Sequence, residues 1–249
     1  MDEKENILRV SNLNVSYKDR SKGIFGKNNR IQVLKDVSFS MKKGEILGLV
    51  GESGSGKSTL AKAILGLIPY EGEIYHNSRY PQMVFQDPYG SLNPAKKVGW
   101  TLEEPLRLRG RMSAGERKQK VVQMLEKAGL DEKFADRYPS QLSGGQRQRI
   151  CIAAALMQEP GLLIADEPVS ALDVTIQAQI LKLLKNIHKE MGLSILFISH
   201  DLRVVYEMCD RVIIMQKGQL VEAGTVEEVY FNHKSEYTGR LLAAAGIEA

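Results

Sequence analysis

The residues with the clearest chemical meaning form a glycine-rich segment, Gly51-Glu-Ser-Gly-Ser-Gly-Lys57-Ser58. It follows the pattern of glycine, four residues, glycine, lysine, and then serine or threonine. Glycines allow successive backbone N–H groups to point at phosphate oxygens, and a helix beginning near Lys57 would add the positive end of its dipole. Lys57 is suited to neutralise β- and γ-phosphates, and the Ser58 hydroxyl is suited to bind Mg²⁺. The segment therefore predicts a site for a nucleotide and Mg²⁺.

A glycine-rich turn without a ligand is the alternative interpretation of this segment. The flanking sequence favours the phosphate site, because residues 45–50 predict a buried strand before the loop and residues 57–67 predict a helix after it. We therefore expect the loop and the first helical turn to contact the nucleotide. The expected contact residues are Gly51, Ser53, Gly54, Ser55, Gly56, Lys57, Ser58 and Thr59.

A second candidate element is the apolar run 162–165, which is followed by Asp166 and Glu167. A buried strand rarely ends in two adjacent acids without a cation nearby, because desolvating both carboxylates is costly. Asp166 is suited to bind Mg²⁺, and Glu167 is suited to polarise an attacking water as general base. A helix N-terminus that favours acids is the alternative, which the following Pro168 and Val169 weaken. The pair predicts hydrolysis, whereas a nucleoside kinase would need an acceptor site that the sequence does not reveal.

The elements around these residues alternate between strands and helices, which is typical of an α/β fold. Strands are expected at 8–17, 31–41, 45–50, 162–165 and 194–198, and a long apolar-striped helix is expected to end at Gly192. Residues 87–158 show a helical pattern instead, with a capping box from Ser113 to Glu116 and a stop at Gly129. A further capping box, Thr225 to Glu228, opens the last segment.

A pentapeptide, Leu142-Ser143-Gly144-Gly145-Gln146, narrows the class of protein because it resembles the signature of ABC ATPases. Gln146 lies 20 residues before Asp166, which is the family's spacing. A Ser-Gly-Gly turn that opens a helix can also bind an anion through its N–H groups, or act as an ordinary helix cap. The resemblance implies ATP as the nucleotide. It also implies a head-to-tail pair of subunits, in which residues 143–146 close on the partner's γ-phosphate.

Three further residues match the family's order along the chain. Gln86 resembles the Q-loop glutamine, which senses Mg²⁺ and the transport domain. Asp173, in Ser170-Ala-Leu-Asp173, resembles the D-loop that crosses the dimer interface. His200 follows a predicted buried strand and resembles the switch histidine that contacts the γ-phosphate. The resemblance thus implies that Glu167, His200 and Gln86 support catalysis and that Ser58, Gln86 and Asp166 hold Mg²⁺.

Tyr17 resembles the family's aromatic residue that stacks on adenine, although a core tyrosine is an alternative. A basic insert at 18–30 follows it at once, so that Phe25 is a second candidate for the stacking position. The insert contains five basic residues and one acidic residue, which accounts for the whole net charge of +4. A solvated loop is the simpler interpretation of the insert, and contact with phosphate or acidic lipid is the other.

Longer stretches are similar to the peptide, nickel and opine importer branch of the family, nearest to the second ("F-like") of two non-identical ATPases. They are residues 51–59, 85–94 and 166–179, with Tyr237-Thr238 and Leu241-Leu242 in the tail. The resemblance implies two permease subunits, which contact the surface near 86–94, and an extracytoplasmic solute-binding protein. Ala154 replaces a common arginine, residues 72–81 are short for the family, and the His-Pro expected before Tyr237 is missing. The long C-terminal extension of many oligopeptide importers is also lacking, which favours the short nickel or metallophore members, although short peptide-importer subunits exist too. The resemblance therefore implies peptides, nickel or metal-metallophore complexes as cargo.

The resemblance implies an α/β P-loop NTPase (RecA-like) core with an antiparallel β subdomain and an inserted helical subdomain. We expect a single ABC ATPase domain over 1–249. Its core would span 1–86 and 159–225, its helical subdomain 87–158 and its C-terminal helical tail 226–249.

Composition limits the cell compartment and the partners. The chain lacks an apolar run long enough to cross a bilayer, and its charged start is unlike a secretory signal. Its two cysteines, Cys151 and Cys209, form no Cys-x-x-Cys pair, so a disulfide framework or zinc module is not expected. These features predict a soluble intracellular protein, and the net charge of +4 is too weak to indicate a nucleic-acid partner. The resemblance implies a peripheral position at the cytoplasmic face of the cell membrane and no nucleic-acid partner. The rival classes are a soluble ABC ATPase acting on ribosomes or DNA, and an exporter subunit.

Overall fold

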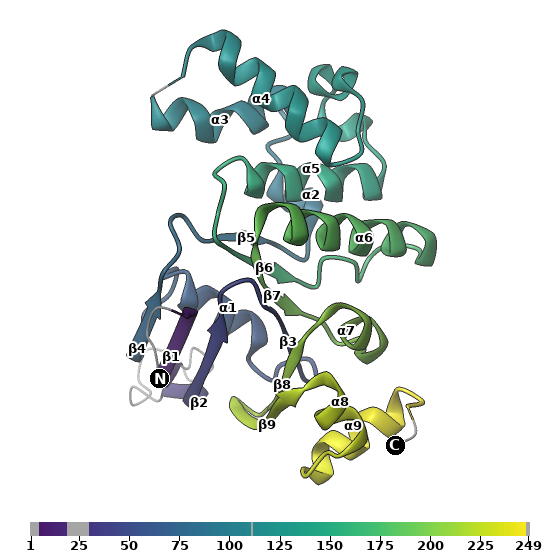
Figure 1. Ribbon diagram of the computed structural model, residues 1–249. Helices are drawn as coiled ribbons and strands as arrows, with labels where there is room; N and C mark the ends of the chain where they lie inside the picture. The colour runs from purple at the N-terminus through teal and green to yellow at the C-terminus, as the bar shows by residue number, and fades with distance from the viewer. Residues whose placement is uncertain (1–4, 19–29, 111, 248–249) are drawn as a thin grey trace. The chain divides into compact units, whose positions relative to one another are not determined.

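The computed structural model describes residues 5–18, 30–110 and 112–247 (Figure 1). These residues belong to two compact units of the chain. The first unit comprises Met1–Asn77 with Ser194–Ala249, and the second comprises Ser78–Leu193. Among the residues described, no helix is both long and apolar enough to span a membrane.

An antiparallel sheet in the first unit contains β1 (Asn6–Lys18), β2 (Arg30–Lys42) and β4 (Glu71–His76), in the order β2-β1-β4. Alternate side chains of a strand point to opposite faces, and in β1 the alternation is interrupted by a register shift between Val10 and Leu13, where Asn12 has a φ of 48°. Apolar side chains on both sides of this irregularity are buried. This buried set includes Leu8, Val10, Leu13, Val15 and Leu34. The strands predicted at 8–17 and 31–41 are confirmed.

The first unit also contains four strands in the order β7-β3-β8-β9. β3 (Ile46–Val50) runs parallel to β7 (Ser194–Ile198) and to β8 (Arg211–Gln216), while β9 (Gln219–Thr225) is antiparallel to β8. Every residue of β3 and β7 is buried, as is typical of parallel strands covered on both faces. The helices of this unit are α1 (Lys57–Ile64), α7 (Leu202–Met208), α8 (Val226–Phe231) and α9 (Glu236–Ala244).

The second unit combines a parallel strand pair, β5 (Gln82–Val84) and β6 (Leu162–Asp166), with helices. The helices are α2 (Pro88–Ser91), α3 (Val98–Arg109), α4 (Ala114–Lys127), α5 (Gly144–Leu156) and α6 (Val174–Met191), with 3₁₀ turns at Glu132–Asp136 and Pro139–Gln141. Apolar side chains of α3, α4 and α5 share one core around Leu102, Leu106, Leu125 and Ile150. The helical pattern predicted for 87–158 is confirmed.

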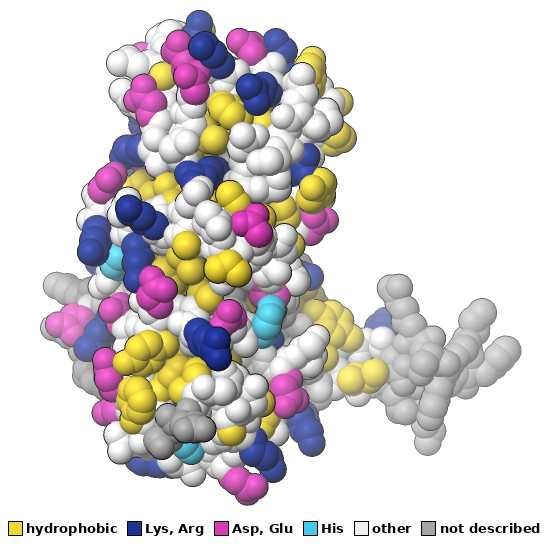
Figure 2. Space-filling model, turned by 90° about the vertical axis from the view of Figure 1, so that its right-hand side faces the viewer, with side chains coloured by type: hydrophobic (Ala, Val, Ile, Leu, Met, Phe, Trp, Pro, Cys, Tyr) yellow, Lys and Arg dark blue, Asp and Glu magenta, His cyan; other side chains and the backbone are white. Residues whose placement is uncertain are grey.

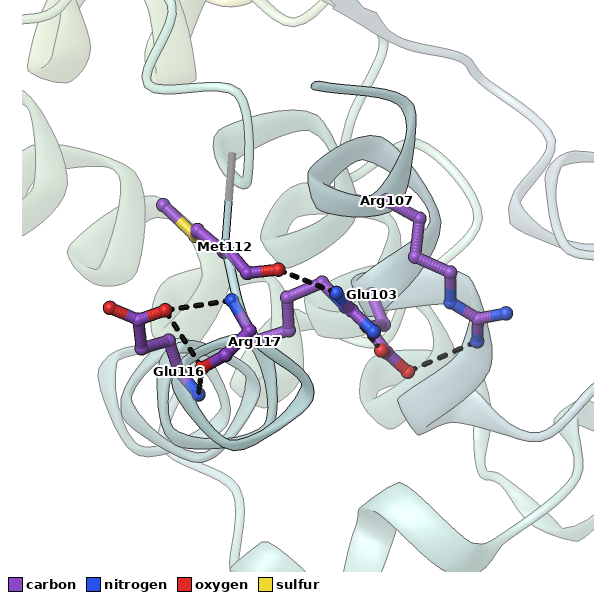
Figure 3. Close-up of polar contacts among 6 residues, drawn as sticks. Glu103, Arg107, Met112, Glu116 and Arg117 are labelled. Atoms are coloured by element: carbon purple, nitrogen blue, oxygen red, sulfur yellow. Dashed lines mark hydrogen bonds and ion pairs between the residues drawn. The ribbon is translucent and has the colours of Figure 1, made fainter. Parts of the chain in front are cut away.

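Ionic contacts join α3 to α4 outside this core (Figure 3). Glu103 of α3 accepts from Arg117 Nε of α4 at 2.7 Å and from Arg107 at 3.0 Å. Arg117 also donates to the carbonyl of Met112 at 2.7 Å, in the turn between the two helices. The hydrogen bond from Arg117 is the main cause that lowers the pKa of Glu103, so this carboxylate is charged at neutral pH. The contacts join α3, α4 and the turn between them.

Helix ends follow the predicted capping chemistry. Ser113 and Thr225 both form complete capping boxes, and Gly192 ends α6 in the left-handed conformation with φ 60°. Four strands were not foreseen in the sequence: β4, β5, β8 and β9. β4 is exposed and carries two glutamates, so it lacks an apolar pattern, whereas β8 and β9 flank a Lys217-Gly218 turn that is a usable hairpin signal.

Candidate functional site

The phosphate loop lies between β3 and α1 in the first unit, as the sequence predicts. Gly54 and Gly56 have φ angles of 79° and 109°, a region that side-chain-bearing residues rarely adopt. At Gly51 the constraint is space, because an added Cβ would lie 2.2 Å from the carbonyl oxygen of Met215 on β8. The backbone shape of this loop thus depends on all three glycines.

Lys57 at the start of α1 folds back over this loop. Its side chain donates to the carbonyl of Gly51 at 2.7 Å and to the carbonyl of Glu52 at 3.0 Å. Only 7% of the residue is exposed, so the ammonium depends on such acceptors for its stability. An incoming phosphate oxygen can take their place and would add a full negative charge.

Ser55 provides a direct test of whether the loop fits a phosphate. Its backbone carbonyl accepts from Gly218 at 2.9 Å, which fixes the residue against the β8–β9 turn. Its side-chain hydroxyl is buried and has no hydrogen-bond partner among the described residues. Buried hydroxyls are usually satisfied, so this one fits an oxygen-rich ligand. Ser58 is exposed and Thr59 half-buried on the first turn of α1, and Ser53 is exposed in the loop.

Two residues predicted to act in hydrolysis are hydrogen-bonded to each other in the second unit. Gln86 Nε2 donates to Glu167 Oε2 at 2.9 Å. Glu167 follows Asp166, which is the last residue of β6. The side chain of Asp166 is buried, with 6% of the residue exposed. The parallel pairing of β5 with β6 brings the two together, because both strands end at the same edge of the pair. This contact was not foreseen, although the spacing from each strand end could have indicated it.

The backbone of Glu167 is unusual, since its φ is 47° and the residue is not glycine. Such a conformation persists only where neighbours hold it. The carbonyl of Glu167 accepts from the backbone N–H of Ser170 at 3.3 Å and from the Ser170 hydroxyl at 3.2 Å. Ser170 thus holds the backbone of Glu167, while Gln86 holds its carboxylate.

The signature residues also lie in the second unit, at the start of α5. Ser143 and Gln146 form a capping box, with the Ser143 Oγ accepting from Gln146 N at 3.3 Å and Gln146 Oε1 accepting from Ser143 N at 3.0 Å. Asp173 caps α6 by accepting from Ile176 N at 3.0 Å. A hollow of about 280 Å³ is lined by Ser143, Gly145, Gln146 and Ile176, among others. The structure therefore places the signature residues beside the first turn of α6, which Asp173 caps.

Arg147 is a residue of this region that sequence reasoning missed. It is 6% exposed and donates to the carbonyls of Pro139 and of Leu142, the first residue of the signature pentapeptide. Its guanidinium also stacks on Tyr89 at 3.7 Å from the ring centre, which is a cation–π contact. On the same helix, burial raises the pKa of the Cys151 thiol to about 12, so this cysteine is not a nucleophile at neutral pH.

His200 and Tyr17 lie in the first unit. His200 is exposed between β7 and α7, next to Asp201, which caps α7 by accepting from Arg203 N at 2.9 Å. Tyr17 is 41% exposed near the end of β1, where it is paired with Ile31 of β2. Both side chains are accessible to a ligand. Residues 19–29 lie outside the described residues, and with them Phe25 and most of the basic insert.

Comparison with known proteins agrees with this arrangement. The ABC transporter family profile matches residues 34–170. The dipeptide transport ATP-binding protein DppF of Haemophilus influenzae is 47% identical over 90% of this chain and 73% of its own length. The oligopeptide transport ATP-binding protein OppF of the same organism is 48% identical over 98% of this chain and 79% of its own.

A solved structure shows the same fold. It is the dimeric ATP-binding cassette MJ0796 in a post-hydrolysis state, bound to ADP and Pi, with a TM-score of 0.76 and 32% identity. The likeness covers 88% of this chain and 98% of the other. The chain therefore belongs to the ABC transporter family of ATP-binding proteins, and the predicted P-loop NTPase fold is confirmed. Members of this family bind and hydrolyse ATP.

The close packing of α5 on α6 gives a first testable prediction. A Cβ added at Gly145 would lie 2.4 Å from Ile176 Cγ2, and a β-branched side chain has little freedom to move away. We expect Gly145→Ala to lower the free energy of unfolding by about 1–3 kcal/mol, measured by denaturant titration.

Gly115→Ala is the matched control, because nothing lies within 4 Å of the position where its Cβ would be added. The double variant Gly145→Ala with Ile176→Ala should recover part of the loss. Equal stabilities for Gly145→Ala and Gly115→Ala would contradict the packing described for the signature.

Proposed function

We propose that this chain binds and hydrolyses MgATP to drive the import of peptides through a membrane transporter. The observation that carries the hydrolytic part is the hydrogen bond from Gln86 to Glu167 at 2.9 Å, which holds a carboxylate beside the end of β6. The names of the relatives DppF and OppF support the transport part. A general base must be held in a fixed position, and the hydrogen bond from Gln86 holds the Glu167 carboxylate in this way.

Each site residue has a role in this proposal. Lys57 neutralises charge on the β- and γ-phosphates while the N–H groups of residues 51–59 hold their oxygens. Glu167 orients the attacking water and accepts its proton, and Gln86 keeps the carboxylate in place. His200 contacts the γ-phosphate, and Tyr17 offers its exposed ring to adenine.

The proposal assigns Mg²⁺ to Ser58, Gln86 and Asp166. Hydroxyl, amide and carboxylate oxygens suit this hard cation, which prefers oxygen ligands and keeps several waters. When bound, the ion would offset the negative charge that develops on the transferring phosphate.

A second ATPase subunit, non-identical to this one, is part of the proposal. Ser143, Gly144, Gly145 and Gln146 would close on the partner's nucleotide, and Asp173 would face the partner. Val174, next to Asp173, supports an interface here because this apolar residue is 81% exposed. The MJ0796 cassette is itself described as a dimer.

Peptides are the cargo that the comparisons favour over nickel. DppF and OppF are named for dipeptide and oligopeptide transport, whereas the absence of a long tail was the reason to expect nickel or a metallophore. Nickel and metal-metallophore complexes are the alternative cargo. An extracytoplasmic solute-binding protein would deliver the cargo, and the chain would act at the cytoplasmic face of the membrane.

The rival role on ribosomes or DNA receives less support. The relatives reported above are transport proteins, and nucleic-acid partners favour a surface with basic residues gathered together. Figure 2 shows basic and acidic side chains interspersed among the described residues of one face.

A groove of about 1100 Å³ in the second unit is the surface we propose for the permease subunits. It is lined by the end of α3, Met112, the segment before β5, and Gln158 and Glu159. Leu108 is 84% exposed and Tyr80 is 53% exposed, with the Arg109 guanidinium 4.7 Å from the centre of the Tyr80 ring. Apolar side chains with adjacent arginines fit a helix that carries apolar residues and an acid. Phe85 and Tyr89, near the surface predicted at 86–94, are exposed as well.

Leu108→Arg tests this surface. The side chain is exposed, so we expect unchanged folding and MgATP binding but loss of most permease co-purification and of most transport-coupled ATPase activity. Leu67→Arg is the control, since Leu67 is 59% exposed, follows α1 and does not line the groove. Normal co-purification of the Leu108→Arg variant would show that the permease binds elsewhere.

Glu167→Gln tests the hydrolytic role. The amide cannot accept the proton of the attacking water, so steady-state ATP hydrolysis by the purified transporter should fall at least about a hundredfold while MgATP binding persists. Glu190→Gln, on the exposed end of α6, should hydrolyse ATP normally. Hydrolysis at the wild-type rate by the Glu167→Gln variant would remove Glu167 from the proposed mechanism.

A further inference from the structure

The C-terminal helix α9 brings the side chain of Tyr237 to the phosphate loop. The hydroxyl of Tyr237 accepts from the backbone N–H of Glu52 at 3.4 Å, a long hydrogen bond. Tyr237 is buried, with 6% of its surface exposed, and lies in the first turn of α9. None of the roles assigned above uses this contact.

The same peptide group is bonded to Lys57 at its other end. The N–H of Glu52 and the carbonyl of Gly51 belong to one planar peptide, and Lys57 Nζ donates to that carbonyl at 2.7 Å. Any rotation of this peptide would therefore disturb its bonds to Tyr237 and to Lys57 together. The Tyr237 hydroxyl thus helps to orient the Gly51 carbonyl, which accepts the hydrogen bond from the Lys57 ammonium.

Tyr237 is itself well fixed. Glu222 of β9 accepts from the backbone N–H groups of Lys234 at 2.6 Å and of Ser235 at 3.2 Å, just before α9 begins. Thr238, the next residue of the helix, is 1% exposed. Burial raises the pKa of Tyr237, so its hydroxyl stays neutral at physiological pH and the contact does not titrate there.

We infer that Tyr237 is a positioning residue for ATP binding, because it orients the Gly51–Glu52 peptide from which Lys57 moves to the phosphates. The inference rests on the proposed phosphate-binding role of residues 51–58. Without the hydroxyl, the Gly51–Glu52 peptide can rotate more freely. The free energy of fixing its orientation would then weaken ATP binding. The loss falls on binding rather than on the chemical step, because Tyr237 does not touch the reacting atoms.

Tyr237→Phe removes only the hydroxyl and keeps the buried ring. We expect the Kd for MgATP of the purified chain, and the KM of the assembled transporter, to rise about threefold to tenfold, the effect of one hydrogen bond. The kcat of the transporter should stay within about twofold of the wild-type value. Calorimetric titration gives the Kd, and steady-state hydrolysis gives KM and kcat separately.

Tyr230→Phe is the matched control. Tyr230 on α8 is also a buried tyrosine of the first unit, but its hydroxyl donates to the carbonyl of Leu202 and not to the phosphate loop. This variant should lose thermal stability, as removal of a buried hydrogen bond does, without a change in Kd or KM. Melting curves of both variants confirm that each is folded.

The outcomes separate this inference from the proposed function. A Kd for Tyr237→Phe equal to that of the wild type or of Tyr230→Phe would overturn the positioning role, and so would an effect confined to kcat. If the unaltered chain failed to bind MgATP, the phosphate-binding role of residues 51–58 would itself be wrong. Wild-type binding together with an unaffected Tyr237→Phe variant contradicts the role of Tyr237 alone.

Discussion

A lysine ammonium shielded from water needs oxygen acceptors, and this requirement organises the phosphate loop. Lys57 meets it with the carbonyls of Gly51 and Glu52, at 2.7 and 3.0 Å. The backbone can present those carbonyls only because Gly51 approaches Met215 closely and Gly56 has a positive φ. The positive charge of Lys57, which would bind the phosphates of ATP, is thus held in the loop by backbone carbonyls.

The surrounding elements of the first unit can be understood from this loop outward. β3 is buried along its whole length and fixes where the loop begins, and α1 fixes where it ends. The β8–β9 turn donates to Ser55 through Gly218, and α9 reaches Glu52 through Tyr237. Elements distant in the sequence therefore hold a single loop. In the second unit, hydrogen bonds from Gln86 and Ser170 hold Glu167 in a similar way. Both the phosphate loop and Glu167 are therefore fixed by neighbouring residues.

The sequence was most informative where chemistry demands particular residue types at fixed spacing. Residues 51–58, Asp166, Glu167 and the signature 143–146 could be selected as candidate site residues because glycine, lysine and carboxylates have few substitutes in these motifs. The capping boxes at Ser113 and Thr225 and the stop at Gly192 were predictable because they are local.

Contacts between segments far apart in sequence were not predictable. β4 lacks an apolar pattern, and its place depends on pairing with β1. Tyr237 contacts Glu52 although the two residues are 185 positions apart, and Arg147 stacks on Tyr89. No sequence motif predicts either contact. Such contacts depend on tertiary packing, which periodicity does not record.

Calorimetric titration of MgATP into the Lys57→Ala chain is the most direct test of the central claim that Lys57 supplies the charge for phosphate. Loss of charge-assisted hydrogen bonds should weaken binding by at least about a hundredfold. Lys62→Ala, which removes an exposed lysine from the last turn of α1, should bind as the wild type does. A folded Lys57→Ala chain with wild-type affinity for MgATP would contradict the account.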